Sequence, residues 1–246
     1  MPSSPASSSS SRLAARCLGC GREFETEQVV LLGQKFAAER YCALCRAAEE
    51  ACDEQRRADE RWARVLVPSA YDGSTFENFE PVPDTRNALA VCRQWTKEFR
   101  AGTDLRQGLL LRGNPGAGKT HLAVAILREV IWSGQKKTAL FLNVPGWLNA
   151  LRESYGDGEP PPNPSGYDLV VLDDLGAEDW SSWARDRIYN LVNQREQARR
   201  LVIVTTNHEW QELAGRVGGP TASRLRRLTR EVHVDARHDY REREAA

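Results

Sequence analysis

The residues with the clearest chemical meaning are the run Gly-Asn-Pro-Gly-Ala-Gly-Lys-Thr at 113–120. It fits G-x-x-x-x-G-K-[ST], a pattern in which the glycines let backbone N–H groups face an anion. The following helix would add its positive N-terminal dipole. Lys119 would reach the β and γ phosphates, and the Thr120 hydroxyl would ligate Mg²⁺. The sequence therefore predicts a nucleotide site formed by Gly113, Asn114, Pro115, Gly116, Ala117, Gly118, Lys119, Thr120 and His121.

Two aspartates follow the apolar segment 169–172. Parallel α/β sheets bind their ligands at the carboxyl ends of the strands, so Asp173 and Asp174 are expected at that edge. Asp173 would hold Mg²⁺, and Asp174 would orient and deprotonate the attacking water. The alternative is a pair of turn-forming aspartates before Gly176.

The next apolar segment, 201–205, becomes polar at its end, where Thr205 and Thr206 are followed by Asn207. A side-chain amide there could bond both a γ-phosphate and the attacking water. The arginines that follow have three interpretations that sequence position does not separate. They could complete a neighbouring subunit's site, contact a nucleic-acid backbone, or form a solvated helix face.

Four of the six cysteines form two Cys-x-x-Cys pairs about twenty residues apart, namely Cys17, Cys20, Cys42 and Cys45. This spacing is typical of a four-thiolate zinc site. Cys52 is a spare ligand, and Cys92 falls outside the module. The alternative is a set of free or redox-active thiols. Because so short a segment builds little core, the metal would supply most of its folding energy.

The composition is that of a globular chain with local rather than global charge. Of 246 residues, 41% are hydrophobic and 28% charged, and 34 Lys plus Arg balance 34 Asp plus Glu. This balance excludes a generally basic nucleic-acid-binding surface. No apolar run reaches the ~18 residues of a membrane span, and the Ser-rich start lacks a secretory apolar stretch. We therefore expect a cytoplasmic protein without a membrane partner.

Changes in composition predict a disordered tail at 1–12, a zinc-binding module and helix at 13–66, a linker at 67–83 and an ATPase domain at 84–246. In that last part helical and strand patterns alternate, which is typical of an α/β fold with a parallel sheet between helices. The expected strands are 108–111, 138–142, 169–172, 201–205 and 232–234, and the expected helices are 46–65, 88–99, 119–132, 147–152 and 181–198.

From about Pro68 onward, roughly three quarters of the chain resembles the DnaC-like/IstB-like AAA+ ATPases, which are replicative helicase loaders and their transposition relatives. The resemblance rests on VPSAYDGSTFENFE, GLLLRGNPGAGKTHLA, LVVLDDLGAE, LVIVTTN, SRLRR and DYR. It implies an AAA+ P-loop core without a full helical lid. It also implies that Asn207 is the sensor 1 residue, Arg224 the arginine finger and Arg241 a nucleotide-binding sensor 2 arginine. The enlarged loop at 218–221 leaves Arg216 and Arg226 as alternatives to Arg224.

The resemblance further implies an ATP-dependent loader that places the replicative DNA helicase on single-stranded DNA and self-associates through the ATP site. The DNA would contact Trp147, Leu148, Arg152 and Tyr155, although the first two could equally be core residues. The zinc module favours the loader over an IstB-like ATPase that binds DNA and regulates a transposase. A small-molecule phosphotransferase and a nucleotide switch that hardly hydrolyses ATP are alternatives of other classes.

Overall fold

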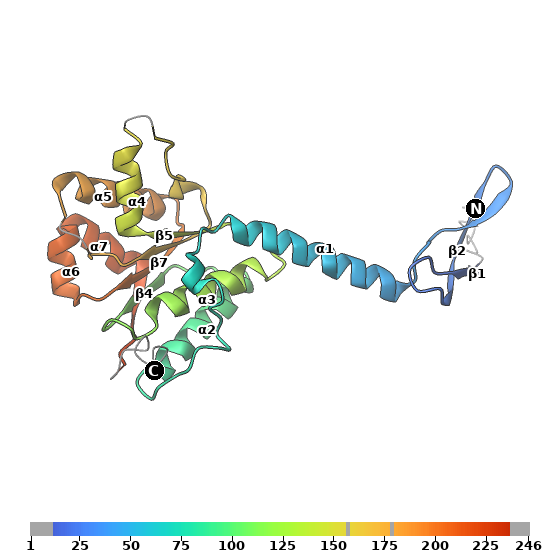
Figure 1. The fold of residues 1–246 in the computed structure, drawn as a ribbon, viewed down its shortest axis with the longest axis horizontal. Helices are drawn as coiled ribbons and strands as arrows, with labels where there is room; N and C mark the ends of the chain where they lie inside the picture. Colours follow the sequence, from blue (N-terminus) through green and yellow to red (C-terminus); the bar gives the residue numbers. More distant parts are fainter. Residues whose placement is uncertain (1–11, 156–157, 178–179, 237–246) are drawn as a thin grey trace, which may run out of the picture. The chain divides into compact units, whose positions relative to one another are not determined.

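The computed structural model describes residues 12–155, 158–177 and 180–236. The chain divides after Arg57 into two compact units, which are described separately (Figure 1). The boundary falls within helix α1 (Ala43–Ala63). The module expected at 13–66 is thus shared between the units, and the linker expected at 67–83 belongs to the second one.

The first unit contains a small antiparallel sheet in the order β1-β2-β3, followed by the start of α1. Its strands, which sequence reasoning did not predict, are β1 (Arg12–Arg16), β2 (Glu23–Leu31) and β3 (Gln34–Ala37). Leu32 and Gly33 join β2 to β3 with φ values of 51° and 76°, a left-handed pair suited to a tight hairpin. Within the described part of this unit, only Cys17, Thr26 and Cys42 are buried, so it lacks an apolar core.

The second unit is built on a five-stranded parallel sheet in the order β5-β6-β7-β4-β8. Its strands are β4 (Gly108–Arg112), β5 (Ala139–Asn143), β6 (Leu169–Asp173), β7 (Leu201–Thr206) and β8 (Thr229–His233). Its helices are α2 (Arg86–Arg100), α3 (Lys119–Ile131), α4 (Val144–Glu153), α5 (Ser182–Gln197), α6 (Trp210–Val217) and α7 (Gly219–Leu228), with 3-10 turns η1 (Ser69–Tyr71) and η2 (Pro164–Gly166).

Every residue of β4, β6 and β7 is buried, as expected for parallel strands covered on both faces. Successive side chains enter two different cores. Leu109 and Leu111 pack with α2 and α3, whereas Leu110 packs with α4, α5, α6 and α7. Figure 1 shows these helices on the two sides of the sheet. The predicted α/β fold with a parallel sheet between helices is therefore confirmed.

The order of the strands determines where the site forms. β4, which leads into the glycine-rich loop, lies between β7 and β8, and β6 lies on the far side of β7. The carboxyl ends of β4, β6 and β7 therefore meet at one edge. The last strand begins at Thr229, three residues before the expected start at Val232. Within the described part of the chain, no helix combines the length and apolarity needed to cross a membrane.

Candidate active site and metal site

The loop between β4 and α3 has the backbone that phosphate binding requires. Gly118, the residue before α3, has a φ of 91°, and a Cβ there would lie 2.5 Å from Phe79 Cε2. At Gly113 a Cβ would lie 2.1 Å from the carbonyl oxygen of Val234. Only glycine fits at these two positions, one for its conformation and both for the close approach of neighbouring atoms. The loop thus presents the N-terminus of α3 as an anion site.

Lys119 is 5% exposed and donates to the carbonyl oxygens of Gly113 (2.9 Å) and Asn114 (2.6 Å). Its ammonium is therefore held against the loop whose anion it would neutralise. Thr120, the next residue, donates through Oγ1 to Asp173 Oδ1 at 2.9 Å. The predicted hydroxyl and carboxylate ligands of Mg²⁺ are thus already in contact.

Asp173 is 3% exposed at the end of β6, and it also accepts a hydrogen bond from Thr205 Oγ1 at 2.7 Å. Burial raises the pKa of this carboxyl to about 6, despite opposing hydrogen bonds from Thr205 and Thr120. A bound cation would offset that burial cost by favouring the carboxylate. The donor set of one carboxylate and one hydroxyl matches the oxygen ligands that Mg²⁺ takes.

Asp174, the next residue, has different surroundings from Asp173. Its φ is 56°, in the left-handed region, and its N–H donates to Thr205 Oγ1 at 2.9 Å. It lines a pocket of about 440 Å³ together with Lys119, Thr120, His121 and the exposed Asn207. The structure therefore brings together the polar residues predicted from three separate segments. The pocket volume falls in the range of about 300–1,000 Å³ typical of small-ligand sites.

The segment expected to be a linker forms one wall of this pocket. Tyr71, Ser74, Asn78 and Phe79 all line it. His121 Nε2 donates to the carbonyl oxygen of Thr75 at 2.8 Å, and its ring lies 5.3 Å from that of Phe79. Sequence reasoning missed this wall, although the aromatic residues of the segment were a usable signal for burial.

The three candidate arginine fingers all have partners in their own chain. Arg224 on α7 bonds Asn193 Oδ1 at 3.0 Å and Glu196 Oε2 at 3.4 Å, and it does not line the pocket. Arg216 donates to the carbonyl oxygen of Gly176 at 3.1 Å. Arg226 lies 4.6 Å above the Trp210 ring. The expected sensor 2 residue, Arg241, lies outside the described residues.

The four residues expected to contact DNA separate into two groups. Leu148 is fully buried and Trp147 is half-buried against the same core, so the expectation is wrong for Leu148, which is a packing residue. Arg152 and Tyr155 are exposed, and both meet Trp183 of α5. The Arg152 guanidinium lies 4.8 Å from the Trp183 ring, and the Tyr155 ring lies 6.3 Å from it.

The cysteine pairs of the first unit converge as predicted. The Sγ atoms of Cys17, Cys20, Cys42 and Cys45 all lie within 4.8 Å of one another. A Cβ added at Gly19 would lie 3.1 Å from Cys45 Sγ, so the turn leaves little room for a larger residue. Cys52 is exposed and is not part of the cluster. Four clustered thiols fit the tetrahedral four-cysteine set of a structural zinc ion.

Local electrostatics separates the thiols of this cluster. The Cys42 backbone N–H donates to Cys17 Sγ at 3.3 Å, and this bond is the main reason why the pKa of Cys17 falls to about 6. The pKa of Cys45 rises to about 12, chiefly because of its contact with Cys20 and then with Cys17 and Cys42. Crowded thiolates repel one another, so a divalent cation is the natural partner for the group.

The sheet order, the glycine-rich loop and the acidic strand end together define a P-loop protein of the AAA+ ATPase class. The model of the family "IstB-like ATP binding protein" matches residues 84–244, about two thirds of the chain. The chain belongs to this family.

Two relatives are replicative helicase loaders. DnaC of Escherichia coli K12 is 26% identical over 209 residues, which cover 82% of each chain. DnaI of Bacillus subtilis is 26% identical over 154 residues, or 61% of this chain and 48% of the relative. In three dimensions, a crystal structure of the DnaC helicase loader matches 68% of this chain and 99% of its own, with a TM-score of 0.61 and 26% identity. The AMPPCP-bound DnaA of Aquifex aeolicus shares the fold, with a TM-score of 0.57 at 20% identity.

Proposed function

We propose that this protein is an ATP-dependent loader that places the replicative DNA helicase on single-stranded DNA at the start of replication. The observation that carries the proposal is the similarity to the DnaC loader across 82% of both chains, a larger share than the two thirds of this chain that the family match covers. The pocket at the carboxyl edge of the sheet supports the ATP-dependent part of this activity. The separate cysteine unit supports a second binding surface.

In the proposed ATPase reaction, each pocket residue has a distinct task. Lys119 neutralises the phosphate charge, and Thr120 with Asp173 would hold Mg²⁺, which would neutralise the developing phosphate charge when bound. Asp174, which lines the pocket and is not enclosed like Asp173, orients the attacking water and takes its proton. Asn207 donates its amide to the γ-phosphate and orients the same water. Arg224 of a neighbouring copy would complete the site after leaving its own Asn193 and Glu196.

The wall formed by residues 71–79 would accommodate the adenine and ribose, because it adds apolar and aromatic surface to a pocket that is otherwise polar. The phosphates then lie toward Gly116, Gly118 and Lys119, at the N-terminus of α3. The base and the phosphates of the nucleotide would therefore occupy opposite ends of one pocket.

The first unit would bind zinc and contact the helicase. Its β2–β3 hairpin exposes several large apolar side chains, namely Val29, Val30, Leu31, Leu32 and Phe36. Leu32, at the tip, is fully exposed and also has a left-handed backbone, which is costly for a leucine. An apolar, strained tip favours insertion into a protein groove over a role in the unit's own packing.

Single-stranded DNA would contact the second unit at Arg152, Tyr155 and Trp183. Aromatic rings stack on bases, and arginine adds attraction for the backbone, which suits a strand without fixed sequence. The proposal thus replaces the buried Leu148 with Trp183 in the expected DNA surface.

Co-elution with the replicative helicase of the same organism on a sizing column, in ATP and then in ADP, tests the proposal. We expect a complex that is favoured by ATP and that disappears when Cys17 and Cys20 are replaced by serine. Leu32→Asp should also abolish it, whereas Leu44→Asp, at another exposed leucine of the first unit, should not. A complex unaffected by Leu32→Asp would remove the hairpin from the proposal.

The absence of a helicase complex under either nucleotide would refute the loader function. If the protein then bound duplex DNA in an ATP-dependent manner and engaged a transposase, an IstB-like ATPase that regulates a transposase would be the better assignment.

A further inference from the structure

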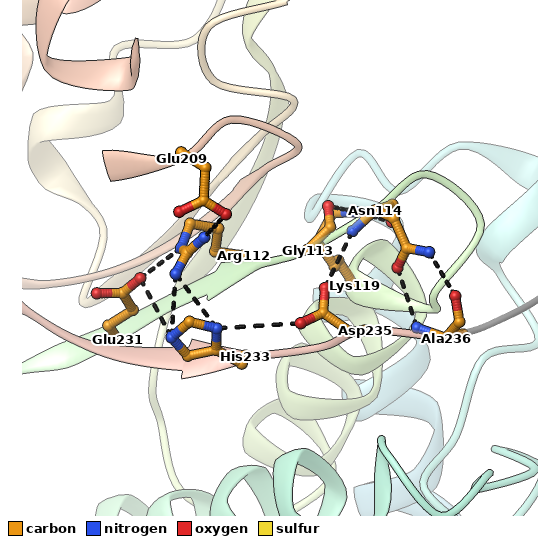
Figure 2. A network of polar contacts seen from close by, with 9 residues as sticks. All are labelled: Arg112, Gly113, Asn114, Lys119, Glu209, Glu231, His233, Asp235 and Ala236. Carbon is orange, nitrogen blue, oxygen red and sulfur yellow. Dashed lines mark hydrogen bonds and ion pairs between the residues drawn. The ribbon is translucent and has the colours of Figure 1, made fainter. Parts of the chain in front are cut away.

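Arg112 is a buried charge immediately before the phosphate loop, and the ATPase reaction described above does not use it. It is the last residue of β4 and is 8% exposed. Its guanidinium donates through Nε to Glu231, through Nη1 to Glu209, and through Nη2 to the His233 ring at 3.1–3.2 Å. Figure 2 shows the arginine between these three side chains. Each nitrogen of the guanidinium therefore has a partner.

The partners of Arg112 come from both neighbouring strands. In the register of the sheet, Arg112 is opposite Thr206 of β7 and His233 of β8. Glu231 also lies on β8, whereas Glu209 lies just beyond β7, at the start of α6. The single guanidinium thus joins the strand that carries the phosphate loop to the segments on its two sides.

Asn207 lies between two attachments to the phosphate-loop strand. On one side, the Gly113 N–H donates to the carbonyl oxygen of Thr206 at 3.3 Å. On the other side, Glu209 pairs with Arg112. Asn207 is itself exposed and lines the pocket. The direction of its amide therefore depends on a segment of four residues held at both ends by Arg112 and Gly113.

We propose that Arg112 is a positioning residue. Through Glu209 it fixes the Asn207 amide relative to the phosphate loop, and so it governs recognition of the γ-phosphate rather than nucleotide binding as a whole. This inference rests on the proposed role of Asn207 in the ATPase reaction.

The chemistry of the guanidinium explains why an arginine serves here. Its planar fork offers donors in three directions at fixed angles, whereas a lysine offers one compact charge on a flexible stem. Because the guanidinium is buried, it has lost most of its contact with water and depends on these partners for its hydrogen bonds. Arg112→Lys would keep the charge but could not maintain all the contacts.

A second set of hydrogen bonds, made by Asn114, holds the phosphate loop itself and offers a comparison with the Arg112 contacts. The Asn114 N–H donates to Asp235 Oδ1 at 3.3 Å, and the Asn114 side chain bonds the backbone of Ala236, accepting from its N–H at 3.0 Å (Figure 2). These contacts attach the loop to the chain after β8 and do not involve the Asn207 segment. Asn114→Ala should therefore weaken binding of nucleotides with and without a γ-phosphate alike.

The test compares the dissociation constants of the full-length protein for Mg²⁺-ADP and for Mg²⁺ with a non-hydrolysable ATP analogue. Glu209→Gln and Arg112→Lys should each weaken binding of the analogue about five-fold, the scale of one ion pair, and change ADP binding less than about two-fold. Glu231→Gln removes another carboxylate from the same guanidinium and should leave the ratio of the two constants unchanged. In an Asn207→Ala background, Glu209→Gln should have no further effect.

Equal weakening of ADP and analogue binding by Glu209→Gln would overturn the inference, as would an effect of that change that persists without Asn207. Because the Glu209 side chain is 77% exposed, its replacement should leave the fold intact even if Arg112→Lys does not. If Asn207→Ala alone leaves analogue binding unchanged, the proposed role of Asn207 fails. If Asn207→Ala weakens it and Glu209→Gln does not, only the positioning role fails. Neither result depends on the helicase complex.

Discussion

Asp173 shows how one buried carboxyl responds to its surroundings. It is enclosed at the end of β6 with two threonine hydroxyls on one of its oxygens, and burial raises its pKa to about 6. The ionised form that a cation needs is therefore costly in the free protein. Binding of Mg²⁺ and loss of the proton are consequently coupled.

ATPase activity should fall as the pH decreases through about 6, because protonated Asp173 no longer ligates Mg²⁺. Raising the Mg²⁺ concentration should move this inflection to lower pH, since the cation competes with the proton. The measurement is kcat/KM against pH at two Mg²⁺ concentrations. An inflection that does not respond to Mg²⁺ would assign the titration to another group.

Stability of the metal-free protein should change in the opposite direction. The pKa of Asp173 is higher in the folded state than its ordinary value of 3.8, so the folded state binds the proton more tightly. This group should therefore add stability as the pH falls from about 6 to about 4, up to about 3 kcal/mol. Unfolding free energies of the unchanged protein and of Asp173→Asn, compared across that range, isolate the contribution. Asp173→Asn should lack it.

Asp174→Asn should lower kcat at least about 100-fold, the usual contribution of a general base. Its carboxylate lines the pocket, and its backbone N–H, not its side chain, holds it to Thr205. The fold and the binding of nucleotide should therefore be retained, as measured by the dissociation constant for ADP. An undiminished kcat would indicate that the protein is a nucleotide switch with another base or none.

At the scale of elements, the segment before α2 forms one wall of the pocket that contains the phosphate loop. Phe76 and Phe79 are both buried, but only Phe79 lines the pocket and contacts the ring of His121. Phe79 also lies so close to Gly118 that the two must change together. The segment therefore connects the shape of the phosphate loop to the chain leading from α1.

Phe79→Ala and Phe76→Ala should each lower the unfolding free energy by about 3 kcal/mol, as large-to-small changes of buried phenylalanine do. Only Phe79→Ala should also weaken ADP binding, because it opens the pocket wall beside Gly118. Denaturant unfolding and ADP titration on the two variants make the comparison. Equal loss of ADP affinity in both would mean that the wall acts only through general stability.

Sequence reasoning succeeded where chemistry is local and failed where it depends on distant packing. The strands at 108–112, 169–173 and 201–206 each contain a continuous apolar run, so their existence and type could be predicted. Lys119, Asp174 and Asn207 follow these runs in the chain and line one pocket, and their roles stay predictions. The wall at 71–79 has little regular structure, and its burial depends on α3. The role of Arg112 could not be predicted, because its partners Glu209, Glu231 and His233 are distant in the sequence and meet it only in the folded sheet.

The three strands of the first unit were not predicted, for a different reason. Side-chain exposure alternates along β1 and along the first part of β2, as in a half-buried strand, but these strands are rich in charged residues and have few large apolar ones, so their period-2 pattern is weak in the sequence. The four cysteines were predictable because their spacing alone specifies the site. Leu148 was open to both interpretations, because a helix near a DNA surface and a helix on a core carry the same apolar residues.

At the scale of the whole molecule, the two units should differ in what holds them together. A zinc chelator should unfold the first unit, whose described part buries only Cys17, Thr26 and Cys42, while the second unit retains its two cores. Circular dichroism would report a partial loss of structure, with ADP binding unchanged. Cys52→Ser should behave as the unchanged protein, and loss of ADP binding on chelation would contradict the independence of the units.

The chain before α2 also affects where recombination could join this ATPase domain to other sequences. The backbone carbonyl of Val65 accepts from the N–H of Phe141 in β5 at 2.8 Å, so the edge strand of the sheet is bonded to a residue that precedes the family match at 84–244. Tyr71 and Phe79, also before residue 84, line the nucleotide pocket. Recombination at the border of the family match would therefore transfer a phosphate loop without its wall. We therefore expect that a graft which keeps the pocket complete must begin near Ala58, where the second compact unit starts.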